Sequence, residues 1–193
     1  MRVGVLALQG DWEAHLSALR DAAAPAEPVR TAAAIDRIGA LVLPGGESTA
    51  MLRLMADEHL DERIRGRVVS GMPVLATCAG VILLAAAVDP RQPSLGLLDV
   101  DVVRNGYGRQ VHSTVATVEL DGALGEPPQT EGVFIRAPRI VRTGAGVRVL
   151  GRCGGDPVLV SSGRVVAATF HPELSTDRRV HTLFLRLLED SDA

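Results

Sequence analysis

The clearest chemical signals lie in three short stretches, the first of which surrounds a cysteine. In VLATCAGVILLA (residues 74–85), Cys78 stands between an apolar strand-like run and an apolar helix-like run. A nucleophile at a sharp strand–turn–helix elbow needs small neighbours such as Ala76, Ala79 and Gly80, because the backbone is crowded there. The N-terminus of the following helix favours a thiolate, and the Ala79 N–H is placed to serve as one oxyanion donor. For this stretch alone, a buried structural cysteine is an equally good interpretation.

A histidine and a glutamate form the second stretch, TFHPEL (residues 169–174). An apolar run ends in His171, and Pro172 separates this histidine from Glu173. Proline favours an extended conformation for the residue before it, and residues two apart on an extended segment point the same way. Glu173 is therefore expected to orient the His171 ring and to stabilise its charged form, as the acid of a catalytic triad does. An ordinary surface ion pair is the alternative for this stretch alone.

The third stretch, LPGGEST (residues 43–49), places two glycines directly after a strand-like run. Glycine lets the backbone approach a ligand closely, and the N–H groups of this turn would supply a second oxyanion donor. The alternative is a simple turn in which Ser48 or Thr49 caps the next helix. A phosphate-binding loop does not fit, because the stretch lacks the G-x-x-x-x-G-K-[ST] pattern and the chain has no lysine.

The elements around these stretches predict a sheet that brings them together. In the first half, apolar strand-like runs alternate with helical patterns, which is typical of a parallel sheet with helices on both faces. The predicted strands there are 3–8, 40–43 and 73–77, and the predicted helices are 11–24, 48–55, 60–70 and 80–88. Asp11 is expected to cap the first helix. Cys78 and His171 each follow a strand, so both are expected at the carboxyl edge of the sheet, where such folds place their sites.

The second half consists mainly of short strands separated by Gly, Pro and Asp turns. The predicted strands are 98–103, 114–120, 132–135, 147–152, 158–161 and 165–170, with a hairpin turn at SSGRV. An amphipathic helix is predicted over 177–188. The Ala/Pro-rich tract 22–34 is too short to separate domains, and no repeat or low-complexity tract interrupts the chain. Residues 1–193 are therefore expected to form a single α/β domain.

Composition narrows the classes of function. The formal net charge is −3, and no run of basic residues is long enough for a nucleic-acid tail. The longest apolar run, 72–88, is shorter than the about 20 residues that a membrane helix needs, so no membrane partner is expected. Two cysteines without a signal peptide predict a reducing, cytoplasmic setting, and the Cys and His spacing gives no metal-ligand pattern. All 20 basic residues are arginine, so no side chain can form a lysine Schiff base.

Six motifs in order from Val3 to Leu174 carry a family resemblance. They are GVLALQG, LVLPGGEST, TCAGVILLA, RNGYGRQ, VFIRAP and TFHPEL. The sequence resembles the glutaminase subunit of the two-subunit pyridoxal 5′-phosphate synthase, a class I (triad-type) glutamine amidotransferase. The resemblance implies a class I glutaminase-like three-layer sandwich with a mostly parallel central sheet flanked by helices and a nucleophile elbow. It implies no cofactor for this chain.

The resemblance also assigns roles to particular residues. Cys78 is implied as the nucleophile that attacks the side-chain amide of L-glutamine, His171 as the proton carrier, and Glu173 as the residue that orients it. The implied oxyanion hole uses backbone N–H groups near Gly46 and Ala79. The implied glutamine-binding positions are Gly46, Glu47, Ser48, Arg104, Ile135 and Arg136. Arginine suits the α-carboxylate of glutamine, because its planar fork donates two hydrogen bonds.

A protein partner follows from the resemblance as well. Gln9 and Gly10 match a loop near the oxyanion hole and the partner interface. Docking on a synthase subunit, in a large hetero-oligomer, is implied to complete the oxyanion hole. Ammonia would then pass inside the complex to the synthase, which builds pyridoxal 5′-phosphate in vitamin B6 biosynthesis. The synthase would supply the lysine imines that this chain cannot form.

The sequence departs from the family pattern at two positions. Ala76 stands where glycine is common in the elbow, and His112 stands where an acidic residue is common. Cys153 is interpreted as a structural residue. The remaining histidines, His15, His59, His112 and His181, are interpreted as surface or packing residues without a catalytic role. Three other functions stay open: a glutaminase for another synthase, a cysteine peptidase or deglycase on a similar sheet, and a non-catalytic partner-binding protein. The peptidase or deglycase usually has histidine directly after the cysteine, where this chain has Ala79.

Overall fold

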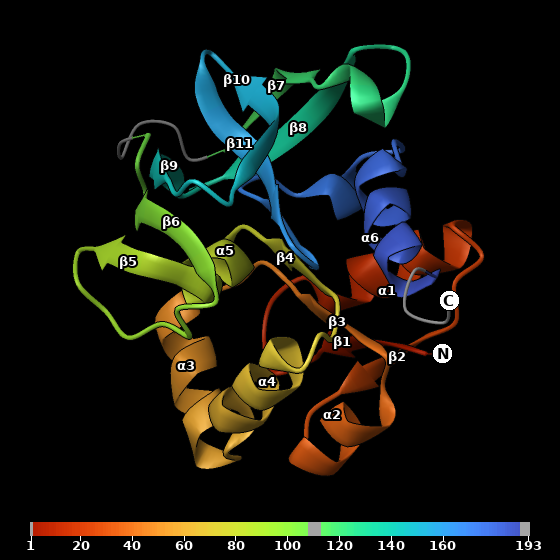
Figure 1. The fold of residues 1–193 in the computed structure, drawn as a ribbon, viewed down its shortest axis with the longest axis vertical. Helices are drawn as coiled ribbons and strands as arrows, with labels where there is room; N and C mark the ends of the chain where they lie inside the picture. Colours follow the sequence, from red (N-terminus) through yellow and green to blue (C-terminus); the bar gives the residue numbers. More distant parts are fainter. Residues whose placement is uncertain (1, 108–112, 190–193) are drawn as a thin grey trace.

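A nine-stranded sheet is the centre of the fold (Figure 1) in the computed structural model, which describes residues 2–107 and 113–189. In spatial order its strands are β2 (Ala26–Val29), β1 (Val3–Leu6), β3 (Ala40–Leu43), β4 (Val74–Thr77), β12 (Val165–Ala168), β11 (Asp156–Ser162), β10 (Arg148–Cys153), β7 (Ser113–Leu120) and β8 (Gln129–Ile135). The first five strands of this order run parallel, and the other four extend the sheet by antiparallel pairing. The predicted α/β fold class is confirmed.

Helices cover both faces of the parallel strands, as the sequence pattern predicts. One face is covered by α2 (Ala32–Arg37), α3 (Ser48–Asp57), α4 (Leu60–Val69) and α5 (Ala79–Leu84), and the other by α1 (Trp12–Asp21) and α6 (Arg179–Glu189). Side chains alternate along β3, so that Leu41 and Leu43 enter the first core and Val42 enters the second. Figure 1 shows α2, α3 and α4 together below the sheet, with α1 and α6 grouped at its right.

A smaller, three-stranded sheet lies beside the main one, and of its strands only the one over 98–103 is among the predicted elements. It consists of β5 (Ala85–Asp89), β6 (Leu98–Val103) and β9 (Arg139–Thr143). The helix predicted over 80–88 is therefore wrong beyond Leu84, because residues 85–89 pair with β6 instead of continuing α5. A short apolar run of this kind fits a buried strand and a buried helix equally well, and only the pairing partner decides between them.

The Ala/Pro-rich tract 22–34 forms two elements that the sequence pattern does not indicate. It contains β2 and most of the first turn of α2. β2 lies at the edge of the sheet, where Pro28 removes no donor that another strand needs. α2 begins after Thr31, whose hydroxyl accepts a hydrogen bond from the Ala34 N–H. The hairpin turn predicted at SSGRV is confirmed, since β11 pairs with β12 and Gly163 adopts a φ of +53°.

The order of the central strands brings the three chemically interesting stretches to one edge. β4 lies between β3 and β12 and is parallel to both. Cys78 follows β4, the glycines of residues 45–46 follow β3, and His171 lies just beyond β12. Since the carboxyl ends of parallel strands meet at the same edge, these stretches come together there, as the sequence predicts. Two 3-10 turns complete the described elements, η1 (Gly122–Leu124) and η2 (Pro172–Leu174).

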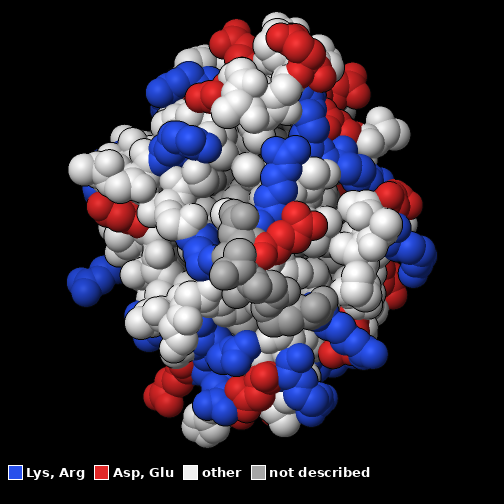
Figure 2. All heavy atoms as spheres, turned by 45° about the vertical axis from the view of Figure 1, so that its right-hand side comes forward, with Lys and Arg blue, Asp and Glu red and all other residues white. Residues whose placement is uncertain are grey.

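The surface mixes its charges. On the face drawn in Figure 2, arginine and acidic side chains lie close to one another rather than in separate patches. Ion pairs join oppositely charged side chains of the protein, including Arg178 with Asp21 and Arg179 with Asp177. Within residues 2–107 and 113–189, none of the helices has the length and hydropathy that would let it cross a membrane.

Candidate active site

Cys78 lies at the point where β4 turns into α5. Its backbone has a φ of +46° and a ψ of −104°, a strained conformation for a residue with a side chain. Gly80 permits this sharp turn, because a Cβ there would lie 2.2 Å from the carbonyl oxygen of Leu43. The Cys78 N–H donates to the Ala168 carbonyl at 2.8 Å, so pairing with β12 holds the elbow in place. The side chain is buried, and its Sγ lies 3.8 Å from the carbonyl oxygen of Ile135.

The His171 ring pairs with Glu173. Nδ1 of the histidine lies 2.7 Å from Oε1 of the glutamate, and both residues are buried. The predicted pairing is confirmed, but the extended geometry predicted for it is wrong. Pro172 starts the 3-10 turn η2, and this turn folds Glu173 back onto the histidine that precedes it. Burial disfavours a charged ring, but hydrogen bonds with Cys78 and Glu173 outweigh it and raise the pKa of His171 to about 10.

Gly45 and Asp11 also approach the His171 ring. A Cβ on Gly45 would lie 2.3 Å from Cε1 of the histidine, so only glycine fits beside the ring. Asp11 is the N-cap residue of α1, and its backbone carbonyl accepts a hydrogen bond from the His15 N–H at 3.4 Å, but its side chain makes no capping hydrogen bond. The predicted side-chain cap is therefore wrong. Oδ2 of Asp11 instead lies 3.6 Å from Nδ1 of His171. Atoms of Asp11, His171 and Glu173 lie within 4.8 Å of one another, a spacing that a metal ion could use. Nδ1 and Oε1 of that group are already committed to each other.

The loops at residues 9–11 and 45–47 pack against each other. Oε1 of Gln9 accepts a hydrogen bond from the Glu47 N–H at 2.7 Å. The same oxygen would lie 2.5 Å from a Cβ on Gly46. Gly10, with a φ of +89°, approaches Gly45 so closely that a Cβ on Gly10 would lie 1.8 Å from the Gly45 carbonyl oxygen. Gln9 and Gly10 therefore set the position of the glycine turn that follows β3.

Glu47 caps the helix α3. Its carboxylate accepts hydrogen bonds from the N–H groups of Thr49 and Ala50 at 3.1 and 2.7 Å, so the alternative in which Ser48 or Thr49 caps this helix is wrong. Burial works in the opposite direction, but these hydrogen bonds hold the pKa of Glu47 below its usual value. Nη2 of Arg104 lies 3.3 Å from Oε1 of Glu47. The cap and the ion pair together fix this carboxylate at the site.

A cavity of about 70 Å³ opens beside the thiol. It is lined by Gly46, Glu47, Ser48, Cys78, Ala79, Ile82, Arg104, Asn105, Ile135 and Arg136. Eight of these are residues that the sequence analysis singles out, so their predicted convergence is confirmed, whereas Ile82 and Asn105 are additional. Cys78, Asn105 and Arg136 all have a positive φ, and the described residues include only two other non-glycine residues of this kind. Backbone strain is therefore concentrated around the cavity.

Signals for the two additional residues exist in the sequence. Ile82 lies one helical turn after Cys78, so it shares the face of α5 that follows the thiol. Asn105 belongs to the motif RNGYGRQ, and asparagine tolerates the left-handed backbone found there.

The end of the motif RNGYGRQ and His112 lie outside the described residues. Ala76 is an ordinary buried residue of β4, paired with Leu43 and Ala167, and Cys153 is a half-buried free cysteine at the end of β10.

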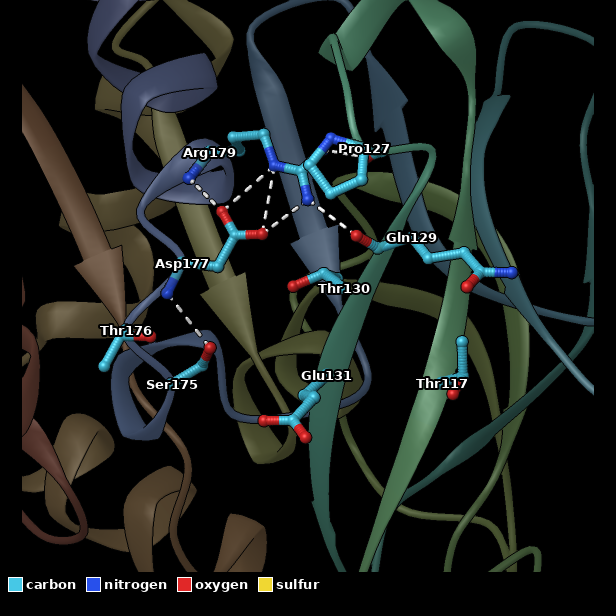
Figure 3. Close-up of a pocket in the computed structure, with 9 residues that line it drawn as sticks. All are labelled: Thr117, Pro127, Gln129, Thr130, Glu131, Ser175, Thr176, Asp177 and Arg179. Atoms are coloured by element: carbon cyan, nitrogen blue, oxygen red, sulfur yellow. Dashed lines mark hydrogen bonds and ion pairs between the residues drawn. The ribbon is translucent and has the colours of Figure 1, made fainter.

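A larger hollow of about 500 Å³ lies elsewhere, between strands β7 and β8 and the segment that leads into α6 (Figure 3). None of the predicted site residues lines it. Arg179 donates to Asp177 at 2.6 Å and to the Gln129 carbonyl at 2.8 Å, and Figure 3 shows these groups turned toward one another. The opposite charges of Arg179 and Asp177 thus satisfy each other in this hollow.

Comparisons with known proteins agree with this site. Residues 5–190 match the SNO glutamine amidotransferase family. A protein of Acidothermus cellulolyticus named pyridoxal 5′-phosphate synthase subunit PdxT is 49% identical to this chain, over 97% of this chain and 93% of the relative. The protein of the same name from Thermotoga neapolitana is 46% identical, over 98% of this chain and 100% of the relative. A crystal structure described as a glutamine amidotransferase superposes with a TM-score of 0.90 at 43% identity, over 98% of this chain and all of that one.

The fold alone is shared more widely. The structure of PurLQS from Thermotoga maritima gives a TM-score of 0.73 at only 16% identity, over 97% of this chain and 98% of that one. The family match spans residues 5–190, and the two relatives share 46–49% identity over 97–98% of this chain. The resemblance carried by the six sequence motifs is thereby confirmed, and the chain belongs to the SNO glutamine amidotransferase family.

Proposed function

We propose that this chain hydrolyses L-glutamine to L-glutamate and ammonia and passes the ammonia to a synthase subunit that builds pyridoxal 5′-phosphate. The observation that carries the proposal is the arrangement around the elbow. A strained, buried cysteine borders a cavity lined by Arg104 and Arg136. His171, whose Nδ1 lies 2.7 Å from Oε1 of Glu173, is at the same edge of the sheet, and its interaction with the cysteine helps to raise the pKa of the ring. The name shared by relatives 45–49% identical over their full length supports the same reaction.

The proposed reaction has two stages. In the first, the raised pKa of His171 keeps the proton of the Cys78 thiol on the histidine ring, and the Sγ thiolate forms a bond to the amide carbon of glutamine. The tetrahedral intermediate then breaks its C–N bond, and His171 gives its proton to the leaving nitrogen, which departs as ammonia. In the second stage, His171 takes a proton from water as the water attacks the thioester, and the C–S bond breaks to release glutamate. Glu173 holds the ring in the orientation that both proton transfers require.

The oxyanion of each tetrahedral intermediate needs backbone donors. We assign this role to the backbone N–H groups near Gly46 and of Ala79, two residues that line the cavity together with Cys78. The Ala79 N–H begins α5, and the first N–H groups of a helix have no partner within the helix. Gln9 and Gly10 hold the loop that carries Gly46, which supports a role for them in setting the oxyanion hole.

The remaining cavity residues are assigned to substrate recognition. Arg104 and Arg136 would bind the α-carboxylate of glutamine through charge-assisted hydrogen bonds. Glu47, whose carboxylate is fixed by the helix cap, offers an acceptor for the α-ammonium group. The Ile135 carbonyl and Ser48 border the same space. The α-carboxylate and the α-ammonium group of glutamine would thus each meet a side chain of opposite charge in the cavity lining.

The wider setting of the reaction is part of the proposal. Residues 1–193 would form one glutaminase domain, as the structural neighbour that covers 98% of this chain supports. Gln9 is half-buried and Gly10 is exposed, so their loop is accessible to a synthase subunit in a hetero-oligomer. The cytoplasm is the proposed location, because a reducing compartment keeps Cys78 available as a thiol.

Glutamate release from L-glutamine tests the proposal. We would measure it with this chain alone, with the candidate synthase subunit added, and with Cys78→Ala as the control. Activity that arises mainly with the partner and is lost in Cys78→Ala is the expected result. An absence of release in both conditions, with binding to the synthase shown independently, would refute the catalytic role and leave a binding protein. Equal release without the synthase would instead argue against activation by docking.

A further inference from the structure

Two buried histidines form a pair next to the triad glutamate, with His15 facing Glu173 and His181 in contact with His15. His15 lies on α1 and His181 on α6, and both are fully buried. Nδ1 of His15 lies 3.2 Å from Nε2 of His181. Nε2 of His15 lies 3.0 Å from Oγ1 of Thr77 and 3.3 Å from Oε2 of Glu173. One imidazole ring therefore touches both the glutamate and the residue that precedes Cys78.

The second carboxylate oxygen of Glu173 needs a donor. Oε1 is committed to His171, and Oε2 is buried with no hydrogen-bond partner in the part of the chain that the structure describes. Leaving such an oxygen unpaired in the protein interior is costly. The group that faces it is Nε2 of His15, at a distance that is long for a hydrogen bond. Such contacts in free enzymes commonly shorten when substrate binds.

The protonation of the two histidines fits a chain of directed hydrogen bonds. Burial and the neighbouring His181 hold the pKa of His15 well below its usual value, and burial lowers the pKa of His181 to about 4. Both rings are therefore neutral near pH 7, with one N–H each. Nε2 of His15 faces two oxygens that can accept, Oγ1 of Thr77 at 3.0 Å and Oε2 of Glu173 at 3.3 Å, so its proton lies there, and Nδ1 accepts from Nε2–H of His181. Nδ1 of His181, which has no partner in residues 2–107 and 113–189, then carries a lone pair rather than an orphaned N–H.

We propose that His15, itself oriented by His181, is a positioning residue that fixes Glu173 in the orientation required by the His171 ring. It acts through Glu173 and does not touch the substrate. The inference rests on the proposed function, because it assigns a role in the same glutamine hydrolysis. It also links α1, which begins directly after the Gln9–Gly10 loop, to the triad by a single side chain.

Substitutions at His15 separate positioning from packing. His15→Gln keeps an amide N–H close to the place of Nε2, whereas His15→Leu keeps apolar bulk and removes the donor. Leu19→Ala is the matched control, since Leu19 is fully buried on the same helix and has no polar contact with the triad. The measurement is kcat and KM for glutamate release by the complex with the synthase subunit, together with the Tm of each variant.

For His15→Leu we expect kcat to fall by about tenfold or more with KM unchanged, as is common when the outer partner of a reacting group is removed. His15→Gln should recover most of this loss, and Leu19→Ala should lower Tm while kcat stays near the wild-type value. Equal kcat values for His15→Leu and the wild type would overturn the inference. So would a loss in Leu19→Ala as large as that in His15→Leu.

A second variant keeps the test decisive if His15→Leu does not fold. His181→Leu leaves His15 in place but removes the donor to its Nδ1. The inference then requires that His181→Leu has a lower kcat than the wild type with an unchanged KM, and that His181→Gln restores the kcat. A wild-type kcat in His181→Leu would overturn the inference. A wild-type complex that releases no glutamate refutes the proposed function itself, which distinguishes the two failures.

Discussion

Gly45→Ala tests how tightly the histidine is positioned. A methyl group at residue 45 would lie 2.3 Å from Cε1 of His171 and 3.1 Å from Nδ1. Real Cβ atoms do not approach other heavy atoms so closely, so either the ring or the loop must move. Gly45 is not among the described glycines with a positive φ, so the substitution adds steric conflict without backbone strain. Its effect therefore reports the steric conflict between residue 45 and the ring rather than backbone strain.

The size of the effect follows from the geometry. To reach ordinary van der Waals contact, the ring must shift by about 1 Å, and a misplacement of about 1 Å in a catalytic group costs roughly 100-fold in rate. This corresponds to about 2.7 kcal/mol in the activation free energy. The ring cannot move freely, because its Nδ1 is bound to a buried glutamate and the residue itself is buried. The shift should therefore also weaken that hydrogen bond.

The assay compares kcat for glutamate release by the complex containing Gly45→Ala with that containing Gly66→Ala. Gly66 is an exposed residue of α4, and a Cβ there has no atom within 4 Å, so this control adds the same methyl group without a contact. Its kcat should equal that of the wild type, with a gain in stability of roughly 0.5–1 kcal/mol from the helix. A Gly45→Ala complex with wild-type kcat would refute the reasoning. A rise in KM alone would also refute it, because the loop rather than the ring would then have moved.

Three further predictions concern stability. The fold raises the pKa of His171 from 6.5 to about 10, so the charged ring stabilises the protein relative to the His171→Gln variant. Urea titrations should show the full difference in unfolding free energy between the two proteins below pH 6.5 and its loss as the pH rises toward 10. A difference that stays constant with pH would contradict this. His15 and His181 have lowered pKa values, so protonation of these rings favours the unfolded chain, and the unfolding free energy should fall as the pH drops from 6.5 toward 4. The fall should be less steep in the His181→Gln variant. Parallel pH profiles of the unfolding free energy for the two proteins would contradict this. Gly80→Ala should lower the unfolding free energy by about 1–3 kcal/mol, because its Cβ would meet a backbone oxygen, and an unchanged Tm would count against this.

Much of the site could be predicted from the sequence because its requirements are local. A crowded elbow demands small residues on both sides of Cys78, and a histidine and a glutamate two residues apart stay neighbours in an extended segment or in a tight turn. The strand order also follows from local patterns, since alternating strands and helices produce parallel pairing with the carboxyl ends together. Cavity residues such as Glu47 and Arg136 came from motif resemblance, which carries information that a single segment does not.

The contacts that escaped prediction depend on distant partners. His15 shows no local signal, because its neighbours Thr77 and Glu173 reach it only once α1 packs on the completed sheet. The run after Leu84 becomes β5 rather than helix because β6, many residues later, offers a pairing partner. Glu47 illustrates a different limit: Ser48 and Thr49 have better side chains for a cap, but the backbone after the glycine turn brings the glutamate to the helix N-terminus.

The position of β12 has a consequence for a chain that is still being synthesised. β12 is the last strand in the sequence but lies beside β4 near the middle of the sheet, and its Ala168 carbonyl holds the Cys78 elbow. A nascent chain that ends before β12 therefore contains the cysteine without its base, without the glutamate, and with one edge of β4 unpaired. The thiol can become an efficient nucleophile only after nearly the whole polypeptide has left the ribosome. Glutamine hydrolysis by this fold therefore cannot begin before synthesis of the chain is nearly complete.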